Sequence, residues 1–513
     1  MKKLFILLLI LACGCVWAQD FGFGFGDDSE PSSSSSPAAK AAVKIGGDIT
    51  VELSPYVRDF NKKEGAQEIS LWDMISGTLN FTAGTSNIEA YAAFNLSADS
   101  IGEVRDKSPK LDDPTYTPLI LDEAYLKAYI GQVNIEAGLR KLAWGKADSP
   151  GPLDITNPMD YTDLRNITDV KTIKIARPML HITWNAGSFS KLEGVFIPNF
   201  AGHRFAEGGR WQPSQAKNMR TTVEEEITSK AMEKFMPIII SQPDLLPVFS
   251  GIKDNLSFDE DFITYPSNGA LEYFQAGLRY TTTIGPADIG GQYFYGSLFR
   301  PSFTVSGIDA FLDDLANGIL GASPPLTINP NYPANLGLIS PEIKYNRYHQ
   351  IGVDYAQVLF GFNVRAEFAV HLTEDLSGDD GSVQNPFIGW SAGFDRDLFW
   401  GVNLNIQCNE TVRLLNDKIG DNPILDAEAG TNAISTRLTI RLSKNFFRDN
   451  LESSATVIWD VENSDYYIIS ALVWTEGSMS WKLSGGIFAG KETGDLGQYW
   501  RNNYVKFGVT YSF

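Results

Sequence analysis

The chain ends with Val505-Lys506-Phe507-Gly508-Val509-Thr510-Tyr511-Ser512-Phe513, a stretch in which apolar residues alternate with polar or small ones. Successive side chains of a β-strand point to opposite faces, so this alternation predicts a strand with one wholly apolar face. We expect the strand to cover residues 500–513. A strand that stops at the last residue of the chain, with an apolar face still to cover, is unusual on the core of a soluble protein.

The same alternation recurs along the chain and predicts about eighteen strands (16–18). In the clearest one, 362–372, Phe362 and Phe368 lie on the apolar face and Arg365 and Glu367 on the polar face. Most segments are long enough for a tilted strand to cross a bilayer. The predicted strands are 43–57, 70–83, 87–99, 119–130, 133–144, 178–187, 189–198, 270–283, 286–298, 344–358, 361–373, 387–396, 399–413, 433–444, 450–461, 465–476, 479–489 and 500–513.

The connections between these strands alternate between short and long. Short turns include 84–86, 131–132, 285–286, 360–361 and 477–478. Long loops include 100–118, 145–177, 199–269, 299–343, 374–386, 414–432 and 490–499. Outer-membrane barrels have an even number of strands, short periplasmic turns and longer extracellular loops. We therefore predict an all-β fold over 43–513, a transmembrane antiparallel up-and-down β-barrel with both ends in the periplasm. A large secreted β-protein is the alternative, but it gives no reason for long loops at one end.

The N-terminus indicates export. Lys2 and Lys3 precede an apolar run of nine residues, and Val16-Trp17-Ala18 provides a cleavage site, so residues 1–18 resemble a secretory signal peptide. Lipidation at Cys13 or Cys15 is the alternative. Residues 19–42 are rich in Gly and Ser and are expected to form a flexible periplasmic tether.

Composition narrows the class of protein further. The chain carries 42 Lys and Arg against 62 Asp and Glu, which argues against nucleic acid as a partner. Beyond the signal peptide only Cys408 remains, so no internal disulfide is expected. The mean hydropathy of −0.13 is compatible with a membrane barrel, because half of each strand faces water. No apolar run is long enough for a membrane-spanning helix.

Two segments resemble known groups. The terminal strand, with Val505, Phe507, Val509, Tyr511 and Phe513 on one face, resembles the assembly signal of bacterial outer-membrane barrels, which the barrel-assembly machinery recognises. Residues 140–163, with Trp-Gly followed by an Asp-x-x-Asn-Pro-x-Asp loop, resemble the domain-of-unknown-function 1302 group of Gram-negative porin-like proteins. That resemblance implies an outer-membrane barrel and names no substrate. Asp148, Asp154 and Asp160 in this segment cap loop turns or bind a cation, and we favour capping.

Two long loops contain helical signals. Thr221–Ile240 and Ile308–Leu320 have apolar residues at helical spacing, which predicts short helices. Either these loops shield the mouth of the barrel from outside, which we favour, or one of them folds inward and narrows the lumen.

Charged residues on the polar strand faces should point into the lumen, because Arg or Lys at mid-bilayer costs about 2–4 kcal/mol on the lipid face. Arg437 and Arg441 lie four apart beside a strand rich in Asn and Gln. We therefore expect them to lack local acidic partners and to form a basic, solute-contacting spot. The lumen-facing candidates are Lys127, Arg140, Arg279, Arg365, Glu367, Arg437, Arg441 and Lys506.

Signals of catalysis are weak. Gly389-Trp390-Ser391-Ala392-Gly393 matches a hydrolase pattern that requires a strand–turn–helix elbow, yet it lies within a predicted strand. The four histidines lie in separate segments, without the spacing of a metal site. We predict no enzyme activity, no cofactor and no metal.

Sixteen to eighteen strands enclose an aqueous channel. We predict a porin in the cell outer membrane for passive or selective diffusion of small polar solutes, with lipid and the assembly machinery as its other partners. The alternative is a barrel whose extracellular loops act as an adhesin or an assembly partner.

Overall fold

The computed structural model describes residues 42–57, 74–99, 121–206, 208–241, 243, 269, 271–320 and 335–513. The predicted signal peptide and nearly all of the tether lie outside these residues. Within them, no helix has the length and apolar character needed to cross a bilayer.

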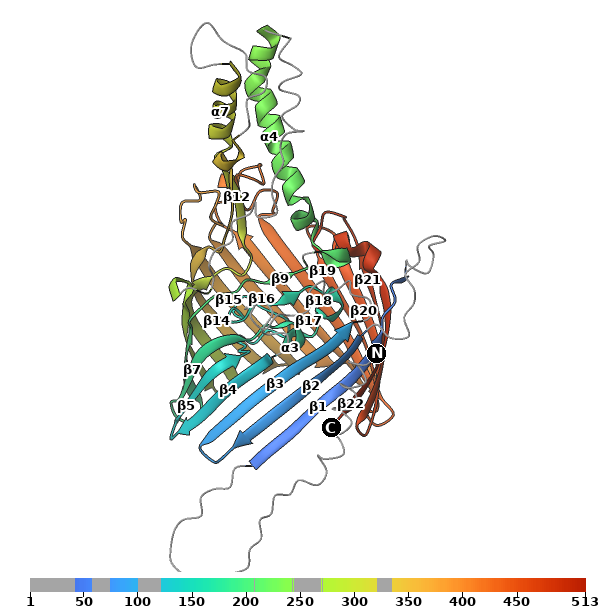
Figure 1. Cartoon of the computed structure of the whole chain (residues 1–513). Coiled ribbons are helices and arrows are strands. Elements are labelled where there is room, and N and C mark those ends of the chain that lie inside the picture. The colour runs from blue at the N-terminus through green and yellow to red at the C-terminus, as the bar shows by residue number, and fades with distance from the viewer. Residues whose placement is uncertain are drawn as a thin grey trace, which may run out of the picture.

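Eighteen strands of the described residues form one closed antiparallel barrel (Figure 1). Each strand pairs with its neighbours around the ring, and β1 pairs with β22 to close it. The fold prediction is therefore confirmed, and each predicted segment overlaps one strand of the barrel, with ends that differ by a few residues. The strands are β1 (Ala42–Leu53), β2 (Met74–Gly84), β3 (Ile88–Asp99), β4 (Leu121–Ile130), β5 (Val133–Arg140), β7 (Arg177–Asn185), β8 (Ser190–Ile197), β10 (Gln275–Ile284), β11 (Ala287–Ser297), β14 (Arg347–Leu359), β15 (Phe362–Thr373), β16 (Phe387–Asp397), β17 (Val402–Arg413), β18 (Ile434–Phe446), β19 (Leu451–Asp460), β20 (Asp465–Glu476), β21 (Met479–Ala489) and β22 (Tyr504–Ser512).

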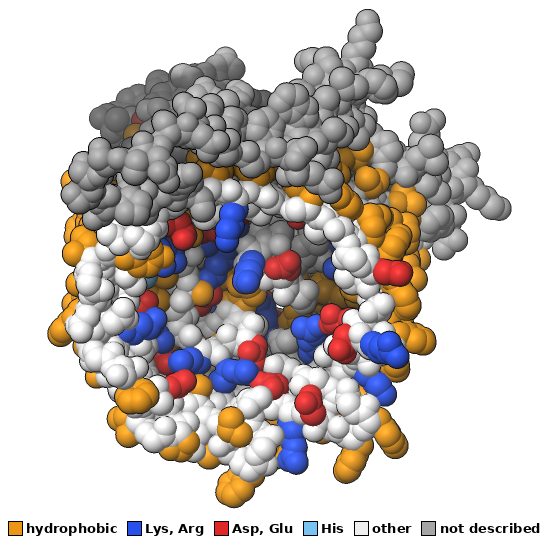
Figure 2. Space-filling model, turned by 90° about the horizontal axis from the view of Figure 1, so that it is seen from below, with side chains coloured by type: hydrophobic (Ala, Val, Ile, Leu, Met, Phe, Trp, Pro, Cys, Tyr) orange, Lys and Arg blue, Asp and Glu red, His pale blue; other side chains and the backbone are white. Residues whose placement is uncertain are grey.

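The barrel is apolar outside and charged inside. Viewed along its axis, hydrophobic side chains surround the ring, and Lys, Arg, Asp and Glu gather within it (Figure 2). On β15 the outward Phe368 is 43 % exposed, while the inward Glu367 and His371 are buried. This arrangement follows from the period of two in the sequence, since each strand sends alternate residues to opposite sides.

The two ends of the barrel differ. At one end the connections are tight turns with Gly131, Gly285 and Gly477 at positive φ, a conformation that glycine adopts at little cost. The turns at this end also expose aromatic residues such as Phe360 and Trp400. Long loops occupy the other end. Ala42 and Phe513 both lie at the short-turn end, because Ala42 pairs with the turn residue Gly84 and Phe513 bonds Gly47.

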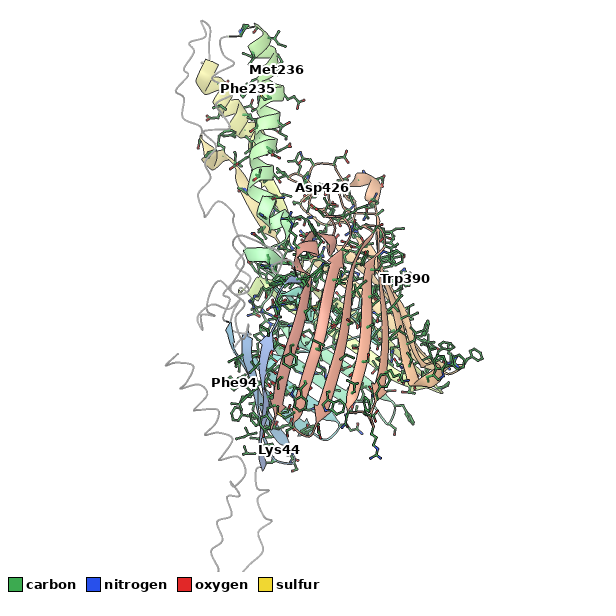
Figure 3. The ribbon with its side chains drawn as sticks, turned by 90° about the vertical axis from the view of Figure 1, so that its right-hand side faces the viewer. Lys44, Phe94, Phe235, Met236, Trp390 and Asp426 are labelled. Atoms are coloured by element: carbon green, nitrogen blue, oxygen red, sulfur yellow. The ribbon has the colours of Figure 1, made fainter. Side chains whose placement is uncertain are left out.

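The two helix-containing loops form an arm outside the barrel. It consists of α4 (Ser214–Ser241), α7 (Ile308–Leu320) and the hairpin β12 (Ser302–Ser306) with β13 (Ser340–Lys344). Figure 3 shows Phe235 and Met236 of α4 far from the ring, while Lys44 of β1 lies at the opposite end. The predicted helices are confirmed, although α4 is longer than expected. Both helices lie outside the barrel, as in the favoured prediction, whereas residues at the bases of the same loops, His203 and Arg300 among them, line the cavity described below.

A hydrophobic core of its own holds the arm together. Ile227 and Phe235 of α4 are fully buried against Phe311 and Leu312 of α7. The β17–β18 loop supports the base of the arm, where Ile424 joins the same core. Burial of a large apolar side chain contributes about 1.5–3 kcal/mol, so this core makes the arm a stable projection.

Candidate functional site

One loop at the long-loop end turns into the lumen. It joins β5 to β7 and comprises residues 141–176, which we name the inner loop. Its hydrogen bonds reach β11, β14, β15 and β17 on one side and β1 and β22 on another. Because these strands lie on different sides of the ring, the inner loop crosses the lumen and narrows it (Figure 1).

The side-chain amide of Asn157 connects the two ends of the inner loop. The fully buried Asn157 accepts a hydrogen bond at Oδ1 from the Leu142 amide (2.8 Å). Its Nδ2 donates to the carbonyls of Arg140 (3.0 Å) and Ile175 (2.9 Å). Arg140 ends β5 and Ile175 lies just before β7, so Asn157 joins the two strands from which the loop departs.

The three aspartates singled out in the sequence, Asp148, Asp154 and Asp160, have partners within the protein. Asp160 accepts a hydrogen bond within its own turn, as the favoured prediction of capping has it, whereas Asp148 and Asp154 form ion pairs that the prediction did not include. The partners are Arg365 (2.5 Å) and Asn405 (2.7 Å) for Asp148, Lys174 (2.6 Å) for Asp154, and the Thr162 amide (3.0 Å) and Arg204 (3.2 Å) for Asp160. Burial raises the pKa of Asp154, against the opposing effect of Lys174.

A carboxylate of the barrel wall anchors the tip of the inner loop. Glu367 Oε1 accepts from the amides of Lys146 (2.5 Å) and Ala147 (2.7 Å), and Oε2 accepts from the Leu153 amide (3.3 Å). Hydrogen bonds to a charged acceptor are about twice as strong as neutral ones. Gly145 and Gly151 leave room for this group, because a Cβ at either position would lie 2.3 Å from a carboxylate oxygen.

Wall amides hold the rest of the tip. Gln407 of β17 accepts from the amides of Asp148 (2.8 Å) and Ser149 (3.0 Å). Gln350 of β14 donates to the Pro152 carbonyl (2.6 Å). These side chains satisfy backbone groups that would otherwise be desolvated against the wall.

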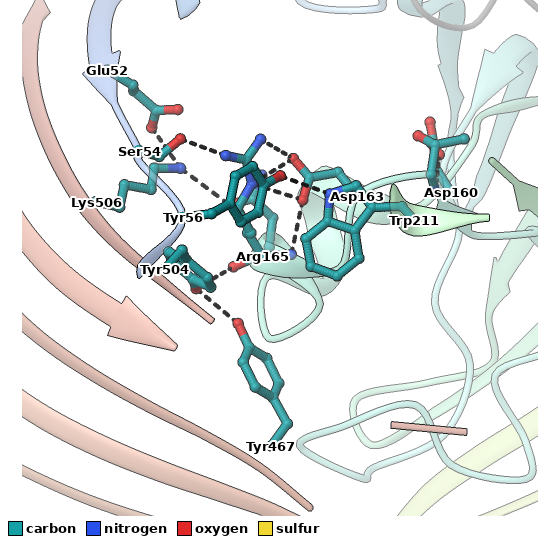
Figure 4. Close-up of polar contacts among 12 residues, drawn as sticks. Glu52, Ser54, Tyr56, Asp160, Asp163, Arg165, Trp211, Tyr467, Tyr504 and Lys506 are labelled. Atoms are coloured by element: carbon teal, nitrogen blue, oxygen red, sulfur yellow. Dashed lines mark hydrogen bonds and ion pairs between the residues drawn. The ribbon is translucent and has the colours of Figure 1, made fainter. Parts of the chain in front are cut away.

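The far part of the inner loop is attached to the seam where β1 meets β22 (Figure 4). Asp163 pairs with Arg165 at 2.7 Å, and Arg165 also donates to Ser54, just after β1. From β22, Tyr504 donates to the Arg165 carbonyl (3.2 Å) and Lys506 to Asn166 (3.4 Å). The loop therefore bridges two separate parts of the wall.

Aromatic side chains surround this attachment. Tyr56 accepts a hydrogen bond from Trp211 Nε1 (3.1 Å) and lies beneath the Arg165 guanidinium. Tyr467 and Tyr504 share a hydrogen bond of 2.7 Å. Burial raises the pKa of Tyr56 to about 12, so its hydroxyl stays protonated.

A buried histidine supports the middle of the inner loop. His203 Nδ1 accepts from the Met159 amide (2.9 Å), and its ring contacts that of Tyr161. The short strands β6 (Asp160–Tyr161) and β9 (Arg204–Phe205) pair in parallel beside it. The start of the β8–β10 loop therefore holds the inner loop from the long-loop end.

A passage remains between the inner loop and the wall formed by β17 to β22. Its cavity has a volume of about 1140 Å³. Ser435, Arg437, Thr439, Arg441 and Ser443 line it from the inward face of β18. The lining is mixed: hydroxyls, amides and charged groups of the wall lie beside apolar side chains such as Ile155 and Phe299.

Charges of both signs line this passage. Arg441 pairs with Glu452 at 2.7 Å, and Asp495 lies 3.4 Å from Arg437 and 3.5 Å from Arg300. Burial would raise the pKa of Asp495, but Arg300 and Arg437 outweigh it and lower the pKa, so the carboxylate stays charged. The prediction that Arg437 and Arg441 lack local acidic partners is wrong. Their partners come from β19 and the β21–β22 loop, whose side chains the β17 pattern alone does not reveal.

The predicted lumen residues divide into two sets. Arg437, Arg441 and Lys506 line the cavity. The other five are engaged in the wall or hold the inner loop: Lys127 and Arg140 pair with Glu136, Arg279 with Asp354, Arg365 with Asp148 and Asp395, and Glu367 bonds loop amides. Whether any of them contacts a solute stays a prediction.

Sequence reasoning missed Asn157, Gln407 and His203 as residues of the site. Asn157 stood within the quoted motif but was assigned only to a loop. Gln407 stood on a polar strand face, which a water-filled lumen explains equally well. Pairs more than 200 residues apart, such as Asp148 with Gln407, leave no local pattern.

The remaining motifs lie where expected. Ser391 of the hydrolase-like pattern is buried in the middle of β16, opposite Glu367 and Asn409 on the flanking strands. In the described part of the chain, no group of three or more His, Cys, Asp or Glu side chains is placed to hold a metal ion.

Acid is expected to loosen the inner loop. Burial, together with Arg300, lowers the pKa of His203 from 6.5 to about 3, so the docked loop holds a neutral imidazole. Its contribution to docking is complete above pH 6.5 and is lost as pH falls toward 3, by roughly 3 kcal/mol at pH 4. Arg165 outweighs burial and lowers the pKa of Asp163, so protonation of this carboxylate below pH 3.8 also weakens docking of the inner loop.

Single-channel conductance should rise between pH 7 and pH 4. His203→Gln, which keeps an acceptor without titrating, should flatten this rise, and an equal rise in the variant would contradict the assignment.

No family model matches the chain, and no curated protein matches it in sequence, so the resemblance of residues 140–163 to the domain-of-unknown-function 1302 group stays a prediction. Solved structures of similar fold include a BenF-like porin from Pseudomonas fluorescens Pf-5, with 10% identity, a TM-score of 0.43 and coverage of 92% of this chain and 98% of that one. OpdK from Pseudomonas aeruginosa has 8% identity, a TM-score of 0.44 and coverage of 92% and 99%. The outer membrane channel DcaP of Acinetobacter baumannii has 11% identity, a TM-score of 0.38 and coverage of 94% and 100%. At these values the likeness concerns barrel architecture alone.

Proposed function

We propose that the protein is an outer-membrane channel for the passive, selective diffusion of small polar solutes. The observation that carries the proposal is the inner loop, which crosses the lumen and leaves a passage whose lining carries both signs of charge. A structural barrel would need no such passage, whereas a channel uses a narrow, charged section to select solutes.

The exterior supports a membrane location. Apolar side chains surround the ring, and aromatic residues project at the short-turn end, as in outer-membrane barrels with aromatic girdles. On this assignment the short turns and both ends of the barrel face the periplasm. The face of β22 that bears Val505, Phe507 and Tyr511 is exposed on the outside, where the assembly machinery and then lipid would meet it.

Planar-bilayer recording tests the channel directly. Refolded protein should produce discrete conductance steps, with a reversal potential that shifts in a salt gradient. Conductance no greater than that of a protein-free bilayer would refute the proposal.

The arm favours a second function, the binding of a partner outside the cell. It is a stable projection with its own core and stands apart from the passage. A variant in which short Gly-Ser linkers replace residues 217–268 and 303–343 retains His203 and Arg300 at the mouth, and should keep wild-type conductance because the inner loop narrows the lumen independently. Loss of cell adhesion in that variant would support the second function. Altered conductance with an intact, heat-modifiable barrel would instead place the arm in the permeation path.

A further inference from the structure

An apolar groove lies on the outer surface of the barrel at β7, β8, β10 and β11. Its volume is about 320 Å³, at the small end of the range of ligand cavities, about 300–1,000 Å³. Only a trace of its lining is polar, and it opens toward the surroundings of the barrel. Its lining includes Gly194, Phe196, Ala276, Leu278, Tyr293 and Tyr295.

Small outward residues create the groove. Gly194 of β8 lies opposite Leu278, and Ala276 of β10 lies opposite Phe196 and Tyr295. The larger side chains of Leu278, Phe196 and Tyr295 project outward on both sides of these two positions, and Leu278 is 57 % exposed. A Cβ on Gly194 would meet only Leu278 at an ordinary 3.5 Å, so the backbone does not require glycine at this position.

A cation lies at the end of the groove nearest the long loops. Phe274 stacks on Phe196, with ring centroids 6.1 Å apart, and Tyr295 lies 5.7 Å from Phe274. The guanidinium of Arg347, the first residue of β14, lies 4.2 Å from the Tyr295 ring centroid. His349, two residues along the same outward face, bonds the Tyr293 hydroxyl at 2.8 Å.

The guanidinium of Arg347 has donors to spare. It donates to the Phe274 carbonyl (2.7 Å), the Tyr295 hydroxyl (3.2 Å) and the Ser297 hydroxyl (3.1 Å). Guanidinium has five N–H donors, so two remain. Glu374 accepts from the backbone amide of Arg347 (3.1 Å), and among the described residues no carboxylate forms an ion pair with the guanidinium.

We propose that this groove binds a lipid with an anionic phosphate headgroup. The phosphate takes the two remaining donors of Arg347 beside His349, and one acyl chain lies over Gly194 and Ala276. Arginine suits a phosphate because its planar fork donates two parallel hydrogen bonds. The cation lies toward the end of the membrane-facing surface and the apolar groove toward its middle, which is the order of a lipid's headgroup and chain. The inference rests on the proposed membrane location.

Native mass spectrometry of the full-length protein in detergent tests the proposal, with phosphatidylglycerol and phosphatidylcholine as probes. The wild type should retain one phosphatidylglycerol with about a tenfold preference over phosphatidylcholine. Arg347→Gln should remove the preference, and Gly194→Leu, which fills the groove, should reduce retention of both lipids. The control Arg396→Gln removes another arginine that lies over an aromatic ring, at the short-turn end and away from the groove, and should behave as wild type.

Three outcomes would overturn the proposal. They are equal retention of the two lipids by the wild type, unchanged retention in both groove variants, or a change of oligomeric state with Gly194→Leu in place of lipid loss, which would assign the groove to a second copy of the chain. Conductance is recorded for every variant and should be that of the wild type. Specific lipid retention without conductance would refute the channel alone, and conductance without lipid preference would refute the lipid site alone.

Discussion

Replacing Glu367 by alanine is expected to open the channel. This carboxylate accepts three backbone hydrogen bonds from the tip of the inner loop. Each of these hydrogen bonds contributes about 1 kcal/mol. Loss of the carboxylate therefore shifts the equilibrium from the docked toward the released inner loop by about a hundredfold or more. The loop would then leave the wall for part of the time, and single-channel conductance should rise with frequent transitions to a larger open level.

Two controls make the result specific. Glu367→Gln keeps an oxygen acceptor but loses the charge, and should give an intermediate effect. Glu89→Ala removes a carboxylate near the short-turn end of β3, away from the inner loop, and should leave conductance unchanged. If Glu367→Ala folds, as shown by a heat-modifiable band, and conducts as the wild type does, the inner loop does not set the width of the channel.

Reversing the charge of Arg437 and Arg441 together is expected to change ion selectivity. Both line the passage, and both are partly exposed to it. By Coulomb's law in water, reversing one charge about 8 Å from a passing ion changes its energy by about 1 kcal/mol. With partial screening at 0.1 M salt, two reversals should raise the ratio of cation to anion permeability about tenfold.

The reversal potential in a potassium chloride gradient measures this ratio. Arg437→Lys with Arg441→Lys keeps the charge and should keep the wild-type potential, while the double glutamine variant should give about half the shift. An unchanged potential in the double glutamate variant, with steps of normal size, would show that ions pass elsewhere.

The barrel was predictable from sequence because apolar residues that face outward and polar residues that face the lumen alternate within each strand. Residues 362–372 alternate so regularly that Phe368 and Glu367 could be assigned to opposite faces, and the structure places them there. Strand ends were less certain. β10 begins at Gln275, five residues after the predicted start, since residues before it form a turn of 3-10 helix at Leu271–Tyr273.

The sequence did not reveal which of the long loops enters the lumen. Helical spacing drew attention to 221–240 and 308–320, but those helices bury their apolar faces against each other and need no lumen. The loop that does enter, 141–176, depends on Glu367 and Gln407, which are more than 200 residues away. Within the loop, Gly145, Gly151 and Asn157 are the residues that mark it in the sequence. Their roles become clear only when the contacts of the loop with the barrel wall are known.

The attachment of Arg165 to Ser54 and Tyr504 has a consequence for biogenesis. Ser54 directly follows β1 and Tyr504 begins β22, and these two strands meet only when the sheet becomes a ring. The set of partners for Arg165 is therefore complete only in the closed ring. If the protein is the channel proposed above, the inner loop takes its place and sets the width of the passage only once the ring has closed.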